Sequence, residues 1–121
     1  MNLRNTILVR KDLGMPIGLL AAQVAHIHSL PYTKSVDDEK FKEWVADPYL
    51  FVHGVPNVET LEYFIEQAIK RNVTVHVWRD TIYMSLTPNM RVALSDVLIG
   101  ASFGPDDSDK IKTVIGDLPL L

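Results

Sequence analysis

A helical segment with one narrow side, residues 18–28, limits the folds open to this chain. Its narrow side carries three alanines, Ala21, Ala22 and Ala25. Such a surface packs closely on a sheet. Another face carries Leu19, Gln23, His26 and Leu30 at helical spacing. Either this is a core helix with hydrogen-bonded polar side chains, the commoner case, or it presents Gln23 and His26 at the mouth of a site.

Short β-branched runs alternate with helical segments along the chain. The predicted strands are residues 6–10, 49–54, 73–79 and 97–103. The predicted helices are residues 16–30, 35–47, 57–71 and 106–115. This alternation favours an α/β fold, a three-layer α/β/α sandwich with a mixed sheet of about four strands. A length of 121 residues suits one domain spanning residues 1–121.

Some boundaries carry specific expectations. Pro31 disfavours helical geometry in the residue before it and predicts the end of the first helix. Asp80 is predicted where strand 73–79 ends, at the kind of strand end where ligand chemistry gathers. Residues 84–96 fit either a short helix or half of a hairpin. Gly100 is expected to mark a bulge or a close approach, and the apolar tail, residues 117–121, is expected to dock.

Composition excludes several kinds of chemistry. The chain has no cysteine, so disulfides, thiolate catalysis and zinc-thiolate sites are excluded. His26 and His28 point about 200° apart on a helix, so they do not chelate one ion. We expect no metal and no cofactor. His76 and Trp78 share one face of a predicted strand, where plain packing is the favoured interpretation.

Charge argues mildly against nucleic acid as a partner. The net charge is −3, so RNA binding needs a local basic patch. The candidate cations are Arg10, Lys11, Lys34, Arg71, Arg79 and Arg91. Scattered surface charge is slightly favoured over a true patch. No apolar run is long enough to cross a membrane, and the N-terminus lacks a signal-peptide core, so a cytoplasmic protein is expected.

Several motifs together resemble a known family. They are residues 9–13 (VRKDL), residues 18–26 (GLLAAQVAH), Arg79-Asp80, Gly104-Pro105, residues 109–112 (DKIK) and residues 115–121 (IGDLPLL). In this order, over nearly the whole chain, they resemble the archaeal and eukaryotic (type II) peptidyl-tRNA hydrolases, as a divergent member. The resemblance implies hydrolysis of the ester that joins a peptide to tRNA.

The resemblance also assigns roles to residues. Asp80 corresponds to the family aspartate, and Gln23 and His26 correspond to helix positions, so these three are the expected catalytic residues. Arg10, Lys11, Asp12 and Arg91 are the expected substrate-binding residues. Leu19 stands at the position of the family lysine. The family threonines fall on Met84 and on either Met90 or Val97.

These departures leave two functions open. The first is an active hydrolase, in which Lys11 or Arg91 replaces the lysine and a hydroxyl from Thr81, Ser85, Thr87 or Ser95 replaces the threonine. The second is a non-catalytic relative that binds RNA or protein. The loss of one preorganised oxyanion donor costs on the order of 100- to 1,000-fold in rate, so the two predict very different turnover. Peptidyl-tRNA or other RNA is the expected partner, and a homodimer is left open.

Overall fold

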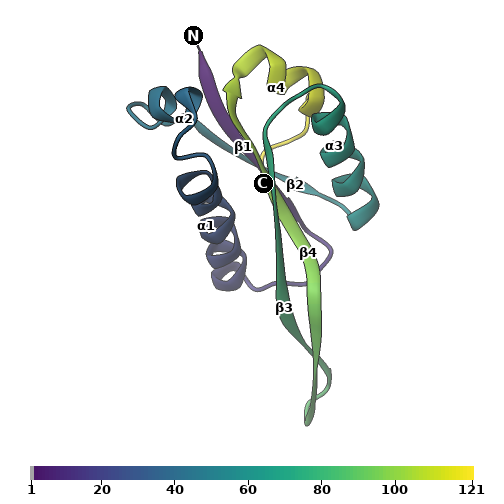
Figure 1. Cartoon of the computed structure of the whole chain (residues 1–121). Helices are drawn as coiled ribbons and strands as arrows, with labels where there is room; N and C mark the ends of the chain where they lie inside the picture. The colour runs from purple at the N-terminus through teal and green to yellow at the C-terminus, as the bar shows by residue number, and fades with distance from the viewer. Residues whose placement is uncertain (1) are drawn as a thin grey trace.

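The structure is a computed structural model that describes residues 2–121, without the side chains of Met84 and Leu86. Its elements are β1 (Leu3–Arg10), α1 (Ile17–Lys34), α2 (Glu39–Trp44), β2 (Leu50–Val55), α3 (Val58–Lys70), β3 (Val75–Thr87), β4 (Met90–Asp107) and α4 (Ser108–Ile115). Figure 1 shows α1 and α2 on one side of the sheet and α3 and α4 on the other. The predicted three-layer sandwich is confirmed.

The sheet has four strands in the order β2-β1-β4-β3. β1 runs parallel to β2 and antiparallel to β4, and β3 is antiparallel to β4. The sheet is therefore mixed, as predicted. β3 lies at one edge, and β2 lies at the other.

The prediction that the alanine side of α1 packs on the sheet is wrong. Ala21, Ala22 and Ala25 are exposed, and the larger side chains Gln23, Ile27 and Leu30 are buried instead.

The sheet and α1 nevertheless approach each other closely at Gly100. Ile27 of α1 is fully buried against the sheet and belongs to a cluster with Ile7, Val9, Ile82 and Ile99. A Cβ atom on Gly100 would overlap the carbonyl oxygen of Leu8 and lie 2.7 Å from Cδ1 of Ile27. Gly100 is therefore a point of close approach between sheet and helix, as predicted.

The predicted end of α1 before Pro31 is wrong. The helix continues to Lys34 with Pro31 inside it, and its carbonyl accepts a 2.9 Å hydrogen bond from the backbone N–H of Ser35. Leu30 and Pro31 are both buried. The ring of Tyr32 packs edge-on against Phe41 at 5.3 Å. The burial of Leu30 and Pro31 and the contact of Tyr32 offset the cost of proline inside a helix, about 3 kcal/mol.

α2 is shorter than the predicted helix over residues 35–47. It begins after Asp38, whose side chain accepts a 2.7 Å hydrogen bond from the backbone N–H of Lys40. Trp44 and Phe41 are buried beneath it together with Leu3. The acidic cap therefore sets the start of the helix, and the two aromatic side chains hold it against the sheet.

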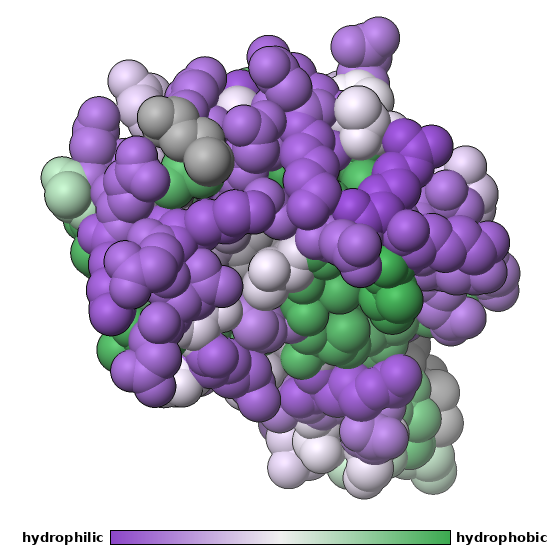
Figure 2. Space-filling view, turned by 45° about the horizontal axis from the view of Figure 1, so that its top comes forward, coloured by the Kyte–Doolittle hydropathy of each residue, from purple (hydrophilic) through white to green (hydrophobic). Residues whose placement is uncertain are grey.

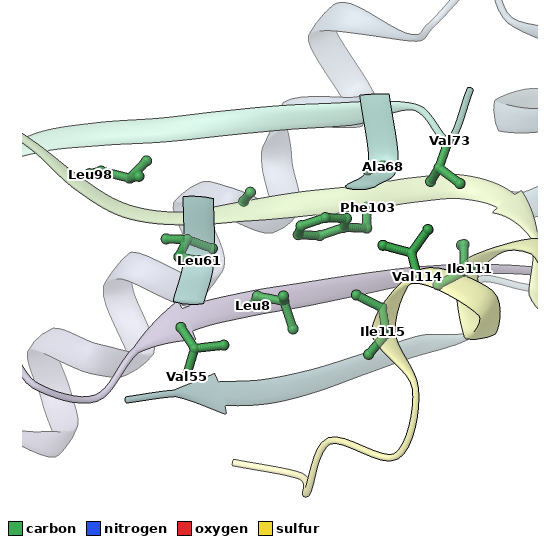
Figure 3. Packing of buried hydrophobic residues seen from close by; sticks show 11 residues of the cluster. Leu8, Val55, Leu61, Ala68, Val73, Leu98, Phe103, Ile111, Val114 and Ile115 are labelled. Atoms are coloured by element: carbon green, nitrogen blue, oxygen red, sulfur yellow. The ribbon is translucent and has the colours of Figure 1, made fainter. Parts of the chain in front are cut away.

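The opposite face of the sheet carries the larger apolar core. In Figure 3, Leu61 and Ala68 of α3 and Ile111 and Val114 of α4 converge on Phe103 of β4. Both helices begin at polar caps. The side chain of Asn57 accepts from the backbone N–H of Thr60, and that of Asp107 accepts from those of Asp109 and Lys110. The predicted helices over 57–71 and 106–115 are confirmed.

β3 and β4 form a long hairpin that closes at residues 88–89. Figure 1 shows the paired ends of these strands projecting beyond the rest of the sheet. Ser85 pairs with Arg91, and Tyr83 pairs with Ala93. The open choice at residues 84–96 is therefore decided for a hairpin. The prediction that β3 ends at Asp80 is wrong, because the strand continues to Thr87.

The C-terminal tail docks on the sheet edge, as predicted. The backbone N–H of Leu121 donates a 2.9 Å hydrogen bond to the carbonyl of Val52, and Leu120 forms a bridge with His53. Nδ1 of His53 lies 2.9 Å from the carbonyl oxygen of Leu118. His53 therefore has a structural role, because these contacts hold the tail against β2.

The surface is mainly hydrophilic in the view of Figure 2, with one compact hydrophobic patch open to solvent. No helix among residues 2–121 has both the length and the apolar character needed to cross a lipid bilayer.

Candidate active site

Gln23 of α1 and Asp80 of β3 meet on the face of the sheet that α1 covers. The amide Nε2 of Gln23 donates a 3.0 Å hydrogen bond to Oδ2 of Asp80. Gln23 is only 3% exposed, whereas Asp80 is half-buried. The sequence predicted both residues for one site, and the fold brings them into contact.

A local irregularity of β3 accompanies this arrangement. The pairing of β3 with β4 shifts register between Trp78 and Arg79 and again between Asp80 and Ile82. Asp80 accepts a second hydrogen bond at Oδ1, 2.8 Å from the backbone N–H of Thr81. Bulges of this kind change the direction of side chains. Here the carboxylate of Asp80 points toward α1, although β3 continues beyond it.

Trp78 and His26 complete the cluster. The indole Nε1 of Trp78 donates a 2.7 Å hydrogen bond to Oε1 of Gln23. The ring of His26 is stacked on Trp78, with ring centroids 5.1 Å apart and planes inclined by 18°. His26 is exposed, whereas Trp78 is half-buried. The interpretation of Trp78 as plain packing missed its contact with Gln23. The signal in the sequence was its place two residues before Asp80, on the same strand face.

Arg10 and Asp12 form an ion pair with each other and lie apart from the cluster around Asp80. Nε and Nη2 of Arg10 donate to the two carboxylate oxygens of Asp12 at 3.0 and 2.8 Å. Nη1 of Arg10 donates to the carbonyl of Leu98 at 3.1 Å. The hydrogen bond from Arg10 lowers the pKa of Asp12 against the opposing effect of burial. Strand alternation places Arg10 with Leu8, on the α3 side of the sheet.

Lys11 and Arg91 also lie away from the cluster. The aliphatic part of Lys11 covers Gly54 of β2, which is separated from β3 by two strands. The guanidinium of Arg91 lies over the ring of Tyr83, 5.6 Å from its centroid, on the projecting hairpin. Within residues 2–121, no Lys or Arg side chain forms an ion pair with Asp80.

The positions of the family lysine and threonines are apolar. Leu19 is 42% exposed on α1, one turn before Gln23. Val97 lies opposite Asp80 in the pairing of β4 with β3, and Met90 is exposed at the end of the hairpin. The side chain of Met84 lies outside those that the structure describes. Of the hydroxyl residues considered as substitutes, Thr81 directly follows Asp80 in the chain.

The other cations of the predicted patch have separate partners. Nη1 of Arg71 donates to the carbonyl of Thr113, and Nη1 of Arg79 donates to the carbonyl of Asp96. The described contacts therefore fit scattered charge better than one basic patch. In the part of the chain that the structure describes, no three His, Asp or Glu side chains are grouped in a way that suits a metal ion.

The chain is similar to known proteins over nearly its whole length. The sequence profile of the family described as Peptidyl-tRNA hydrolase PTH2 matches residues 3–121. A peptidyl-tRNA hydrolase of Staphylothermus marinus is 35% identical over 98% of this chain and 99% of its own length. Those of Methanopyrus kandleri and Methanothermobacter thermautotrophicus are 30% and 29% identical over 98% of this chain, and the matches cover 97% and 100% of their lengths. The chain therefore belongs to the PTH2 family of peptidyl-tRNA hydrolases.

Proposed function

We propose that this protein hydrolyses the ester bond of peptidyl-tRNA and that Asp80 acts on the attacking water. The hydrogen bond between Gln23 and Asp80 carries this proposal. An ionised carboxylate has about four lone-pair sites, and Gln23 and the backbone of Thr81 each occupy one. The remaining sites are free to accept a proton of water. The names of the relatives supply the substrate class.

The proposed reaction is a hydrolysis by general base catalysis. Asp80 takes a proton from water as the water oxygen attacks the ester carbonyl carbon. The tetrahedral intermediate collapses, the C–O bond to the ribose breaks, and the ribose oxygen takes up the proton that Asp80 removed from water, which restores the carboxylate. The products are a peptide with a free carboxyl group and tRNA. Gln23 holds Asp80 in place, and the exposed ring of His26 contacts the substrate beside it.

Substrate binding is proposed to use cations that lie outside the cluster. Lys11 and Arg91 have no described ion pair, so their charges are available for phosphate groups. Arg10 and Asp12 hold each other and shape the loop that leads to α1. The same proposal includes a cytoplasmic location, because translation supplies the substrate there. It is compatible with a homodimer.

A second candidate function is RNA or protein binding without turnover. Leu19 favours it, because an apolar side chain provides neither the charge nor the donor that the family lysine provides. A preorganised donor of this kind accounts for about 100- to 1,000-fold in rate. The two functions differ in one measurable property, which is catalytic turnover.

The test is release of an N-acetylated amino acid from tRNA, measured for the wild type, for Asp80→Asn and for Asp37→Asn. Asp37 is an exposed aspartate in the loop before α2, so it is a matched control for the loss of a charge. We expect turnover by the wild type and by Asp37→Asn, and a loss of about 100- to 10,000-fold in Asp80→Asn. Binding of the same tRNA with a wild-type rate equal to that of buffer would support the second function instead.

A further inference from the structure

The orientation of the Gln23 amide is fixed by a residue that no comparison assigns to the site. Gln23 lies between Trp78 and Asp80, with hydrogen bonds of 2.7 and 3.0 Å to them. An amide side chain has an accepting end and a donating end, and the two ends have nearly the same shape. The shape of the pocket alone therefore does not select which end faces Asp80.

The selection is made at both ends: the carboxylate of Asp80 only accepts, and the indole of Trp78 only donates. Its Nε1–H is a donor only, so it forms a hydrogen bond with Oε1 of Gln23 and not with Nε2. Once Oε1 faces Trp78, Nε2 must face Asp80, where it donates to Oδ2. In the reversed orientation, the donor Nε2 would face the N–H of Trp78, and the acceptor Oε1 would face the carboxylate of Asp80. Gln23 is 3% exposed, so water does not readily replace either lost partner.

We propose that Trp78 is a positioning residue for the hydrolysis: its indole N–H sets the Gln23 amide so that Nε2 holds the Asp80 carboxylate toward the attacking water. The inference rests on the proposed function. Trp78 acts through Gln23 and does not touch the ester. This positioning role differs from the packing role of the Trp78 ring, which supports the stacked imidazole of His26.

The substitution Trp78→Phe separates these two roles. Phenylalanine keeps an aromatic ring under His26 and removes the N–H donor. In this variant Oε1 of Gln23 loses its donor, so the amide is held by Asp80 alone and its position is less fixed. Displacement of a reacting group by about 1 Å costs on the order of 100-fold, so we expect kcat to fall about 10- to 100-fold with KM nearly unchanged.

Trp44 provides a matched control. Its Nε1 donates a 2.8 Å hydrogen bond to the carbonyl of Tyr49, and the side chain is 1% exposed beneath α2. Trp44→Phe therefore removes a similar indole hydrogen bond far from Asp80. We expect it to lower the unfolding midpoint while kcat stays at the wild-type value. Equal losses of kcat in Trp44→Phe and Trp78→Phe would assign both effects to general destabilisation and overturn the inference.

A double substitution tests the route of the effect. If Trp78 acts only through Gln23 on Asp80, Trp78→Phe has no further effect on the residual rate of Asp80→Asn. Independent, multiplicative losses in the double variant would contradict a shared route.

A spectroscopic measurement tests the contact without any turnover. The chain has two tryptophans, so its ¹⁵N–¹H spectrum contains two indole signals, which the two Phe variants assign. We expect Gln23→Met to shift the Trp78 indole signal and to leave the Trp44 signal in place. An unmoved Trp78 signal would overturn the inference even in an active enzyme. If the signal shifts but the protein shows no turnover, the contact between Trp78 and Gln23 stands. The proposed function is then wrong, and the positioning role of Trp78 in hydrolysis is wrong with it.

Discussion

Gln23 and Asp80 are 57 positions apart in the chain, and Nε2 of Gln23 donates a 3.0 Å hydrogen bond to Oδ2 of Asp80. This contact joins a helix on one face of the sheet to the edge strand β3. It is the reason that two polar side chains, separated in sequence by two helices and one strand, form one candidate site.

The first prediction concerns Leu19, which stands one turn before Gln23. Leu19→Lys places an ammonium group on the helix face that carries Gln23, since residues four apart are neighbours on a helix. We expect kcat/KM for peptidyl-tRNA to rise by at least about 10-fold, up to the 100- to 1,000-fold value of an oxyanion donor.

Ile17→Lys is the control for this prediction. Ile17 is 86% exposed and two residues from Leu19, so a lysine there adds the same charge on the other side of α1. A general attraction of tRNA would raise kcat/KM equally in both variants. An equal rise would show that position 19 has no special relation to the site.

The second prediction concerns the close approach of α1 to the sheet. Gly100→Ala forces a Cβ atom against the Leu8 carbonyl and Cδ1 of Ile27, so we expect a loss of about 1–3 kcal/mol in the free energy of unfolding. Gly18→Ala is the control, because a Cβ atom there meets nothing within 4 Å. In a helix this change should gain about 0.5–1 kcal/mol. Urea unfolding of both variants measures the difference, and a neutral Gly100→Ala would contradict the packing described.

Gly100 also shows what the sequence could predict. A lone glycine within a strand-like run indicates a close approach, and alternating strand and helix patterns indicate the sandwich. The caps of α3 and α4 are also local features, because Asn57 and Asp107 are residue types that commonly begin helices. These features depend on neighbouring residues, so a single sequence contains them.

Other features depend on tertiary contacts and were not predictable locally. Pro31 remains inside α1 because it is buried together with Leu30 and because Tyr32 packs against Phe41 of α2. β3 continues past Asp80 because β4 pairs with it out to the hairpin end. The family resemblance assigned Gln23 and Asp80 to one site, whereas their hydrogen bond and the part of Trp78 required the structure.

The third prediction concerns the ion pair between Lys40 of α2 and the buried Asp106. Nζ of Lys40 donates a 2.6 Å hydrogen bond to Oδ1 of Asp106, whose side chain is 1% exposed. Asp106→Asn removes this charge, so we expect a loss of about 1–3 kcal/mol in the free energy of unfolding at pH 7. Glu66→Gln breaks the exposed pair with Lys70 and should change it by less than about 0.5 kcal/mol. Similar losses in the two variants would contradict the account.

The same pair gives a dependence on acid. Burial of Asp106 raises its pKa, but the hydrogen bonds from Lys40 and the Asp107 backbone outweigh burial and hold the pKa below 3.8. The stabilisation is therefore complete above about pH 3.8 and is lost as pH falls through the lower pKa of the folded protein. Unfolding midpoints of the wild type should approach those of Asp106→Asn in this range. A constant gap between them would contradict the assigned cause.

The fourth prediction concerns His28, which packs against Tyr32 and Trp44. Burial lowers the pKa of His28 below its usual 6.5, so the unfolded chain binds a proton that the folded protein excludes. Stability is then full above about pH 6.5 and declines as pH falls toward the lower folded pKa. His28→Phe should weaken this decline in unfolding midpoints. Burial and the charge of Lys34 also lower the pKa of His76, so a part of the decline remains in this variant. An unchanged slope in His28→Phe would contradict the prediction.

The central claim is that Asp80, held by Gln23, promotes hydrolysis of peptidyl-tRNA. Its most direct test is the single-turnover rate of peptide release at saturating protein, for the wild type and for Asp80→Asn with a matched unfolding midpoint. The account predicts a wild-type rate well above that of buffer and a decrease of about 100- to 10,000-fold in Asp80→Asn. Equal rates for the wild type, Asp80→Asn and buffer would contradict it.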